Sequence, residues 1–223
     1  MQLDKNRHYI PMTKDEVRSI IEEKKVKYIS FWFVDVLGSV KSVITPASEL
    51  ENVVDNGVHF DGSSVEGINR RAESDMVLVP DLDTFTLLPW NDNDEDRTAR
   101  ILCTAYTTDG EPSNSDSRNA LVRALQQAEE MGFIYKTGME LEFYLFRMDA
   151  DGNPILSQPH DHAGYFDHTD EETQRIRRKM LQTLRAMGIM VDSAHSETGS
   201  GQHEIDFQYS HALVSADHIL TAR

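Results

Sequence analysis

The segment Gly138–Phe146 (GMELEFYLF) sets acidic residues between apolar ones, and no other feature restricts the fold of this chain as strongly. Side chains of a β-strand point alternately to opposite faces, so Glu140 and Glu142 share one face, about 7 Å apart along the strand. The apolar residues between them then face a core. Two like charges side by side on such a strand repel each other and resist burial. Either a bound cation resolves this conflict or the polar face of the strand is simply solvated.

A second segment, His195–Phe207 (HSETGSGQHEIDF), carries two more glutamates in a pattern that indicates a cation site. Its TGSG stretch is a tight loop by composition, with Glu197 just before it and Glu204 just after it. The strand that follows places Gln202, Glu204 and Asp206 on one face. Carboxylates without cysteines suit hard cations such as magnesium or manganese, which usually serve phosphates bound in the same site. An acidic hairpin without a metal is the alternative.

The acidic composition excludes one class of partner. The formal net charge is −16, whereas a general nucleic-acid surface needs clustered lysine and arginine. No stretch approaches the roughly 20 apolar residues of a membrane helix, and the amino terminus has no apolar signal-peptide core. Cys103 is the only cysteine, which rules out an internal disulfide and fits a reducing cytoplasm. We therefore expect a cytoplasmic protein that binds neither nucleic acid nor membranes.

The first half of the chain has the pattern of a small sheet crossed by one or two helices. Thr13 and Glu16 form a capping box ahead of an amphipathic helix. A second, short helix should begin after Pro46 and end at Gly57. Strands are expected at Val26–Val36, Val40–Ile44, Met76–Val79, Thr84–Leu88 and Arg100–Tyr106.

The composition changes at the loop-like stretch DGEPSNSDS (Asp109–Ser117), and we place a domain boundary there, between residues 1–108 and 109–223. The last residues, HALVSADHILTAR, have the pattern of an amphipathic helix that has just begun. Between these points we expect helices at Arg118–Met131 and Glu171–Met187, and strands at Phe133–Met148, Ile189–Asp192 and Gln202–Tyr209.

Several motifs together resemble glutamine synthetase of the bacterial and archaeal type I. On its own, the Asp-Gly-Ser-Ser part of His59–Ile68 (HFDGSSVEGI) would be a plain turn or exposed loop. With ESDMVLVPD (Glu73–Asp81) it resembles the latch-loop signature of that family's amino-terminal domain. GMELEFYLF resembles the family's Glu-x-Glu-Phe motif, GYFD (Gly164–Asp167) another family marker, and SETGSGQHEIDF its metal-binding loop and strand. The matches follow the family's order, so the chain is similar to the amino-terminal half of such a protein.

The resemblance implies an α+β fold, in which a small β-grasp-like amino-terminal domain precedes the first part of an antiparallel-sheet catalytic domain, truncated in this chain. It also implies ATP-dependent condensation of glutamate with ammonium through γ-glutamyl phosphate, organised by two divalent ions, Mg²⁺ or Mn²⁺. Sites in this family lie between subunits of stacked rings. A homo-oligomer, commonly a dodecamer, is therefore implied.

By matching position, the resemblance gives four glutamates a role in metal binding. Glu142, Glu197 and Glu204 would hold the ion on the glutamate side of the site. Glu140 would belong to the ion nearer the ATP phosphates. These implied roles agree with the alternation of the two strands, which places carboxylates together on one face.

Two aspartates also match functional positions of the family. Asp61 matches the aspartate that helps bind and deprotonate ammonium in the active site of a neighbouring subunit. Asp192 stands where a glutamate near the nucleotide ribose is usual. The family's later metal-binding histidine and its nucleotide-binding arginines would lie beyond Arg223, so we expect the chain alone to be inactive.

Two other functions stay open. A γ-glutamyl–amine ligase of the same superfamily would join glutamate to an organic amine, although Asp61, as part of an ammonium pocket, favours ammonia. A non-catalytic relative used for assembly or regulation would fit a truncated chain. Retention of all four metal-type glutamates favours a ligase over that reading.

Overall fold

The computed structural model describes residues 9, 11–65, 67, 75–91, 93 and 95–223. The chain forms two compact units, Met1–Tyr135 with His211–Leu220 and Lys136–Ser210 with Thr221–Arg223. Within the described ranges, no helix is both long and apolar enough to cross a membrane. The domain limits expected from the sequence, 1–108 and 109–223, stay a prediction, because compactness alone does not test them.

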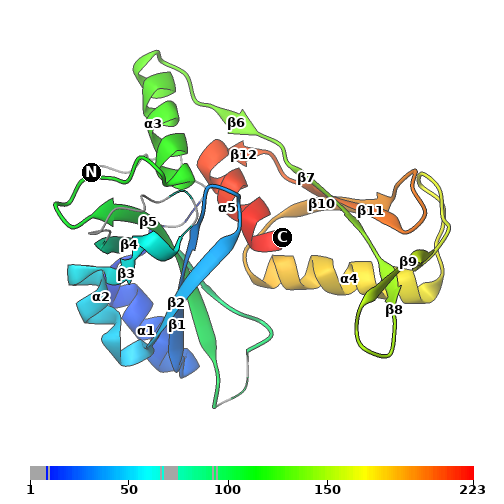
Figure 1. Ribbon diagram of the computed structural model, residues 1–223, viewed down its shortest axis with the longest axis horizontal. Helices are drawn as coiled ribbons and strands as arrows, with labels where there is room; N and C mark the ends of the chain where they lie inside the picture. The colour runs from blue at the N-terminus through cyan, green and yellow to red at the C-terminus, as the bar shows by residue number, and fades with distance from the viewer. Residues whose placement is uncertain (1–8, 10, 66, 68–74, 92, 94) are drawn as a thin grey trace. The chain divides into compact units, whose positions relative to one another are not determined.

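The first unit is built on a five-stranded sheet. Its strands are β1 (Tyr28–Val34), β2 (Val40–Pro46), β3 (Val58–Asp61), β4 (Asp75–Leu87) and β5 (Thr98–Thr107). They lie in the order β2-β1-β5-β4-β3 (Figure 1). Only β1 and β5 run parallel, while the other neighbours are antiparallel. The predicted small sheet is therefore confirmed. It is a mixed sheet, with one parallel and three antiparallel strand pairs.

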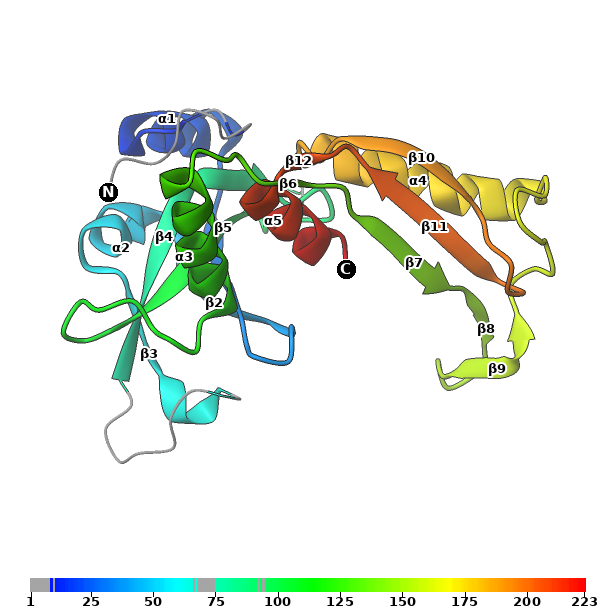
Figure 2. The same cartoon turned by 90° about the horizontal axis from the view of Figure 1, so that it is seen from above.

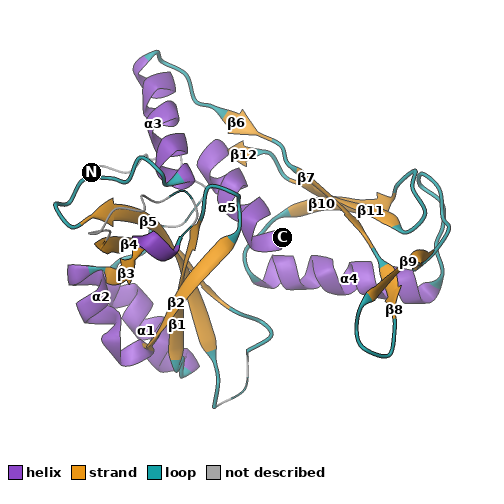
Figure 3. Ribbon diagram, in the orientation of Figure 1, coloured by secondary structure: helices purple, strands orange, loops and turns teal. Residues whose placement is uncertain are grey.

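Three short helices accompany this sheet: α1 (Lys14–Lys24), the 3-10 helix η1 (Ala47–Glu49) and α2 (Leu50–Asn56), drawn purple in Figure 3. The predicted capping box is present, because the hydroxyl of Thr13 accepts the Glu16 N–H at 3.3 Å and the Glu16 carboxylate accepts the Thr13 N–H at 2.7 Å. Gly57 ends α2 as predicted, with a φ of 74°. Local sequence signals thus set these helix ends.

The core of the first unit lies between the helices and the sheet. Val17 of α1 is fully buried, as are Phe31 of β1, Leu78 of β4 and Ile101 of β5. Burying each such apolar side chain contributes about 1.5–3 kcal/mol relative to leaving it in water. The apolar side of α1 therefore has the sheet as its partner.

One expectation for this unit was wrong. Met76–Val79 and Thr84–Leu88 are not separate strands, since β4 continues through both and pairs with β5 on either side of an irregular stretch between Asp81 and Thr86. There the Thr84 hydroxyl accepts the Leu102 N–H at 2.8 Å, which keeps the two strands joined. The turn expected at Asp61–Ser64 is present, because Gly62–Ser64 form a short 3-10 helix, η2, directly after strand β3.

Parts of two family motifs lie outside the described residues. Glu66 and Ile68 of FDGSSVEGI and the first two residues of ESDMVLVPD, Glu73 and Ser74, are among them. The described parts of both motifs lie on β3, η2 and β4.

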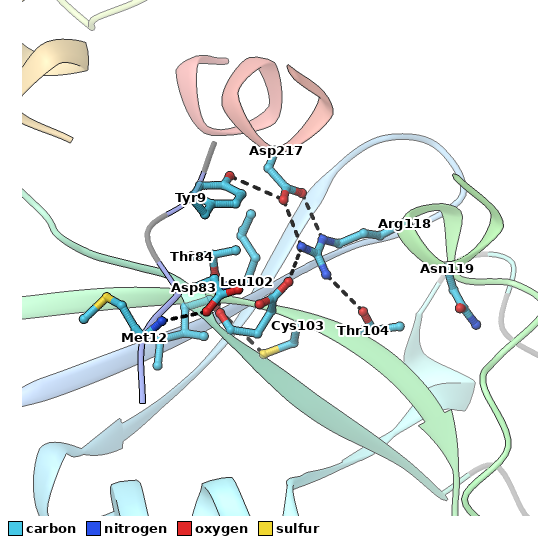
Figure 4. A network of polar contacts seen from close by, with 12 residues as sticks. Tyr9, Met12, Asp83, Thr84, Leu102, Cys103, Thr104, Arg118, Asn119 and Asp217 are labelled. Carbon is cyan, nitrogen blue, oxygen red and sulfur yellow. Dashed lines mark hydrogen bonds and ion pairs between the residues drawn. The ribbon is translucent and has the colours of Figure 1, made fainter. Parts of the chain in front are cut away.

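Two further helices are α3 (Ser117–Glu130) and α5 (Ala212–Ala222), and both were expected from the sequence. Asp116 caps α3 by accepting the Asn119 N–H at 2.8 Å. Within the first unit, Asp217 of α5 lies beside Arg118 of α3 (Figure 4). α5 therefore belongs to the first unit, although almost the whole second unit precedes it in the chain.

The second unit contains a three-stranded antiparallel sheet and one long helix. β7 (Glu140–Tyr144), β10 (Val191–Ser196) and β11 (Gln202–Phe207) form this sheet in the order β10-β11-β7. The helix α4 (Glu171–Ala186) packs against β10, as two views of the ribbon show (Figure 1, Figure 2). The remaining strands are β6 (Lys136–Thr137), β8 (Phe146–Met148), β9 (Pro154–Pro159) and β12 (Ser210–His211).

The long strand expected at Phe133–Met148 was also wrong. That segment is divided into β6, β7 and β8, and only β7 belongs to the three-stranded sheet. The break after β7 comes where Leu145 N–H bonds to the carbonyl of Gly201 at 2.8 Å and its own carbonyl accepts the His160 N–H. Leu145 is therefore bonded on one side to the residue before β11 and on the other to the residue after β9, so the chain changes here from the three-stranded sheet to the β8–β9 hairpin. The predicted turn at Asp151 and Gly152 between these strands is confirmed.

Candidate metal centre

The register of the second unit's sheet brings the acidic side chains of β7 and β11 onto one face. Glu204 of the central strand β11 lies directly opposite Glu142 on β7 and opposite His195 on β10. Asp206 lies opposite Glu140 in the next row. Because directly paired residues project from the same face, all five side chains share it.

The other face of the sheet is the one that α4 covers. Ile205 of β11 is only 2% exposed and pairs with Leu141, which is half-buried. Ser196 belongs to this face and accepts a hydrogen bond at 3.1 Å from Arg177 of α4. The alternation predicted for both strands is therefore present, with apolar residues toward a helix and carboxylates on the opposite side.

A first group of possible metal ligands consists of His195, Glu197 and Glu204. One side-chain ligand atom from each lies within 4.8 Å of the others. His195 Nδ1 is 3.3 Å from a Glu197 carboxylate oxygen. The Glu197 N–H bonds to the carbonyl of Gln202 at 2.9 Å, which closes the loop. This closure explains how two glutamates seven positions apart in the chain come together.

A second group consists of Glu140, Glu204 and Asp206, again with one oxygen of each within 4.8 Å of the others. Glu204 belongs to both groups, so the two share one carboxylate. The shared residue lies on the central strand, whose neighbours on both sides contribute the other members. Two adjoining cation positions are therefore geometrically available.

The electrostatics of Glu204 fit a cation that is bound beside it. Its side chain is buried at 8% exposure, and no hydrogen-bond donor to its carboxylate is found in the described part of the chain. Burial, together with the nearby carboxyl groups of Asp206 and Glu197, raises its pKa to about 7. A buried carboxylate among other carboxylates is costly unless a proton or a cation neutralises it. Oxygen ligands with one imidazole suit Mg²⁺ or Mn²⁺.

Glu142 belongs to neither group. Its carboxylate accepts a hydrogen bond at 2.5 Å from the side-chain amide of Gln202. Of the three glutamates that the resemblance assigns to one ion, Glu197 and Glu204 are therefore together, and Glu142 is bonded to Gln202. Its exposed position directly opposite Glu204, on the same face of the sheet, leaves it adjacent to the first group.

Asp192 and Asp61 lie outside these groups. Asp192 is the extra residue of a β-bulge, since Val191 pairs with Phe207 and Ser193 already pairs with Asp206, and its side chain is exposed. Asp61 belongs to the first unit, where its carboxylate accepts hydrogen bonds at 2.9 and 2.6 Å from the N–H and hydroxyl of Ser63. The roles expected for both aspartates stay predictions.

Sequence reasoning did not nominate His195 or Asp206, although the structure places both with the glutamates. The signal for His195 was its two-residue spacing from Glu197, which puts both on the same side of an extended chain. Asp206 had been placed on the face of Glu204 by alternation. Only the pairing of β11 with β7 brings it next to Glu140.

A cavity of about 330 Å³ lies beside β10, between that strand, α4 and the loop that precedes α4. Arg177 lines it and donates hydrogen bonds to the hydroxyls of Thr169 at 2.6 Å and Ser196 at 3.1 Å. Partial burial lowers the pKa of this guanidinium. The lining includes Phe166, His168, Arg177, Arg178, His195 and Ser196. His195 therefore belongs both to this lining and to the first group of possible metal ligands.

Comparison with known proteins agrees with this geometry. Residues 25–108 match the family model described as "Glutamine synthetase, beta-Grasp domain", and residues 114–223 match "Glutamine synthetase, catalytic domain". Glutamine synthetases of Staphylococcus aureus and Staphylococcus epidermidis are 43% identical over 211 residues, which cover 94% of this chain and 47% of theirs. The chain belongs to the glutamine synthetase family, and the predicted resemblance is confirmed. It spans about half the length of these curated relatives.

Solved structures show the same fold. A Plasmodium falciparum glutamine synthetase matches with a TM-score of 0.79 at 23% identity, over 95% of this chain and 47% of that one. A structure titled "Apo GmaS without ligand" matches with a TM-score of 0.76 at 25% identity, over 91% of this chain and 47% of that one. The expected α+β architecture, a β-grasp domain followed by part of a catalytic domain, is thereby confirmed.

Proposed function

We propose that this chain is part of an ATP-dependent ligase, which joins ammonia to glutamate through γ-glutamyl phosphate and forms glutamine. The observation that carries the proposal is the single sheet face that gathers Glu140, Glu142, Glu197 and Glu204. Identity of 43% to bacterial glutamine synthetases supports the same reaction. The similarity covers about half the length of those relatives.

The carboxylates of this face have a defined task in the proposed reaction. Glu197 and Glu204, with Glu142 beside them, would hold one divalent cation, and Glu140 would hold a second nearer ATP. Bound Mg²⁺ or Mn²⁺ supplies positive charge that stabilises the phosphoryl group during its transfer. The protein's part is to keep these oxygens in place on strands that α4 supports from behind.

The two aspartates would act on the substrates. Asp61 would attract ammonium and accept its proton, because ammonium must lose a proton before it can attack the acyl phosphate. Asp192 would contact the ribose of ATP from the bulge of β10. Both roles come from matching positions in the family.

The proposed setting is a cytoplasmic homo-oligomer, in which Asp61 of one subunit serves a neighbour's site. The single cysteine, Cys103, is fully buried and its pKa is raised by burial, so it is no candidate nucleophile. No nucleic-acid or membrane partner is proposed for a chain of net charge −16.

The test is phosphate release from ATP by the product of the complete gene, with glutamate and Mg²⁺ and with ammonium, methylamine or a polyamine as acceptor. We expect ammonium to give the highest kcat/KM, and Glu204→Gln to remove activity. Glu172→Gln on the exposed start of α4 should not change it. Turnover with an amine but not with ammonium would contradict the proposal in favour of a γ-glutamyl–amine ligase. Absence of turnover with every acceptor would favour a non-catalytic relative.

A further inference from the structure

Asp206 lies in the second group of carboxylates, although the family resemblance gives it no role. It is directly opposite Glu140 in the sheet and two positions from Glu204 on the same face. One oxygen of each of these three residues lies within 4.8 Å of the others. We propose that Asp206 is a further cation-binding residue, which completes a divalent-cation position with Glu140 and Glu204. This inference rests on the proposed metal centre and extends it.

The surroundings of Glu204 indicate a ligand at this point. Its side chain is more than nine-tenths buried, and the described residues offer its carboxylate no hydrogen-bond donor. Asp206 and Glu140 bring further negative charge to the same place. Ionised carboxylates that converge on one point repel one another, and a divalent cation bound between them would offset this repulsion.

A bond from the neighbouring strand orients Asp206. Ser193, its partner in β10, donates its hydroxyl hydrogen to the Asp206 carboxylate. An ionised carboxylate has about four lone-pair positions, so one serine bond leaves most of them for a cation. Ser193 is therefore a positioning residue, which acts on the cation through Asp206.

A purely structural role would not require the charge of Asp206. An asparagine could accept the same hydrogen bond from Ser193 without repelling Glu140 and Glu204. His195 offers little compensation, since its Nε2 is 3.7 Å from the Asp206 carboxylate and is charged only when protonated. The negative charge is thus unfavourable in the cation-free protein and useful only when a cation is bound.

The test measures Mn²⁺ binding directly, by the loss of the free-ion signal in electron paramagnetic resonance, together with thermal unfolding with and without Mn²⁺. Asp206→Asn should weaken Mn²⁺ binding by about tenfold or more. It should also raise the melting temperature of the cation-free protein while reducing the increase that Mn²⁺ causes. Ser193→Ala should weaken Mn²⁺ binding less than Asp206→Asn does. The matched control is Asp151→Asn in the exposed turn of the β8–β9 hairpin, which should change neither quantity.

Two outcomes would overturn the inference, and they are distinguishable from a failure of the proposed function. If Asp206→Asn lowers the melting temperature of the cation-free protein and binds Mn²⁺ like Asp151→Asn, Asp206 is only structural. In that case the loss of Mn²⁺ binding in Glu204→Gln would still support the metal centre. If the unsubstituted protein binds no Mn²⁺, both the metal centre and the role of Asp206 fail. Neither result depends on turnover.

Discussion

Arg118 donates two hydrogen bonds to Asp217, one from Nε and one from Nη2, each at 2.9 Å, across 99 positions of the chain (Figure 4). The same Nη2 also donates to the carboxylate of Asp81 at 2.7 Å. All three side chains are largely buried, at 10% exposure or less. This ion network connects α3, β4 and α5 within the first unit, and it is one of the polar contacts that attach α5 to the rest of that unit.

Replacing Arg118 should be strongly destabilising. Arg118→Ala removes the buried cation that bonds to the carboxylates of both Asp81 and Asp217, and breaking a buried ion pair in this way typically costs about 3–5 kcal/mol. The free energy of unfolding in urea measures this loss. Arg123→Ala on the exposed side of the same helix is the control and should stay within about 0.5 kcal/mol of the unsubstituted protein. A loss below about 1 kcal/mol for Arg118→Ala would mean that the network does not hold α5 in place.

Gly201, between Glu197 and Glu204, should not tolerate a side chain. It has a φ of 72°, and an added Cβ would lie 2.7 Å from the Leu145 carbonyl oxygen and 2.9 Å from Pro159. Gly152 has a similar φ of 83° with open space around it, so Gly152→Ala measures the conformational cost alone, about 1–2 kcal/mol. Gly201→Ala should lose about 1–3 kcal/mol more through overpacking. Equal losses in urea unfolding for the two variants would show that the loop moves without cost.

Stability without divalent cations should fall as the pH rises. The pKa of Glu204 is about 7 in the folded protein, against its ordinary value of 4.5. Between these values the folded state keeps a proton that the unfolded state has lost, so stability is greatest below about pH 4.5 and decreases up to about pH 7. Glu204→Gln should remove this slope, which urea midpoints in the presence of EDTA would reveal. An unchanged slope in that variant would assign the pH dependence to other groups.

Divalent cations should reverse the sign of this pH dependence. Mn²⁺ binds the ionised carboxylates of the folded state, so its affinity rises as Glu204 loses its proton. At a concentration of about 100 times the dissociation constant, one bound ion stabilises the protein by about 2.7 kcal/mol. Thermal unfolding with Mn²⁺, and again after EDTA removes it, measures the effect. The same melting temperature in both conditions would speak against a metal centre on this face.

Local signals predicted much of the fold because they act over a few residues. The capping box of Thr13 and Glu16, the stop at Gly57 and the turn at Asp151 and Gly152 all depend on neighbours in the chain. β4 and the segment after Phe133 were misjudged because their limits depend on distant partners. β4 continues through an irregular stretch because β5 pairs with it on both sides, and β7 ends where Leu145 turns away from β11.

The candidate site divides in the same way. Alternation alone placed Glu140 with Glu142, and Gln202 with Glu204 and Asp206, because side-chain direction in a strand is a local property. Which of these carboxylates meet depends on register, which alternation does not specify. The pairing of β11 with both β7 and β10 makes Glu204 common to two groups. The same pairing leaves Glu142 bonded to Gln202 and adds His195 and Asp206.

By itself, the sequence determined the family, the class of fold and the sheet face on which the glutamates lie, since motifs and alternation are carried by short segments. Only the tertiary structure decided that Arg118 pairs with Asp217 and that Asp206 stands beside Glu140. Both contacts join residues far apart in the chain, and their formation depends on the burial of whole strands and helices. That burial is a collective free energy, and no short stretch of sequence contains it.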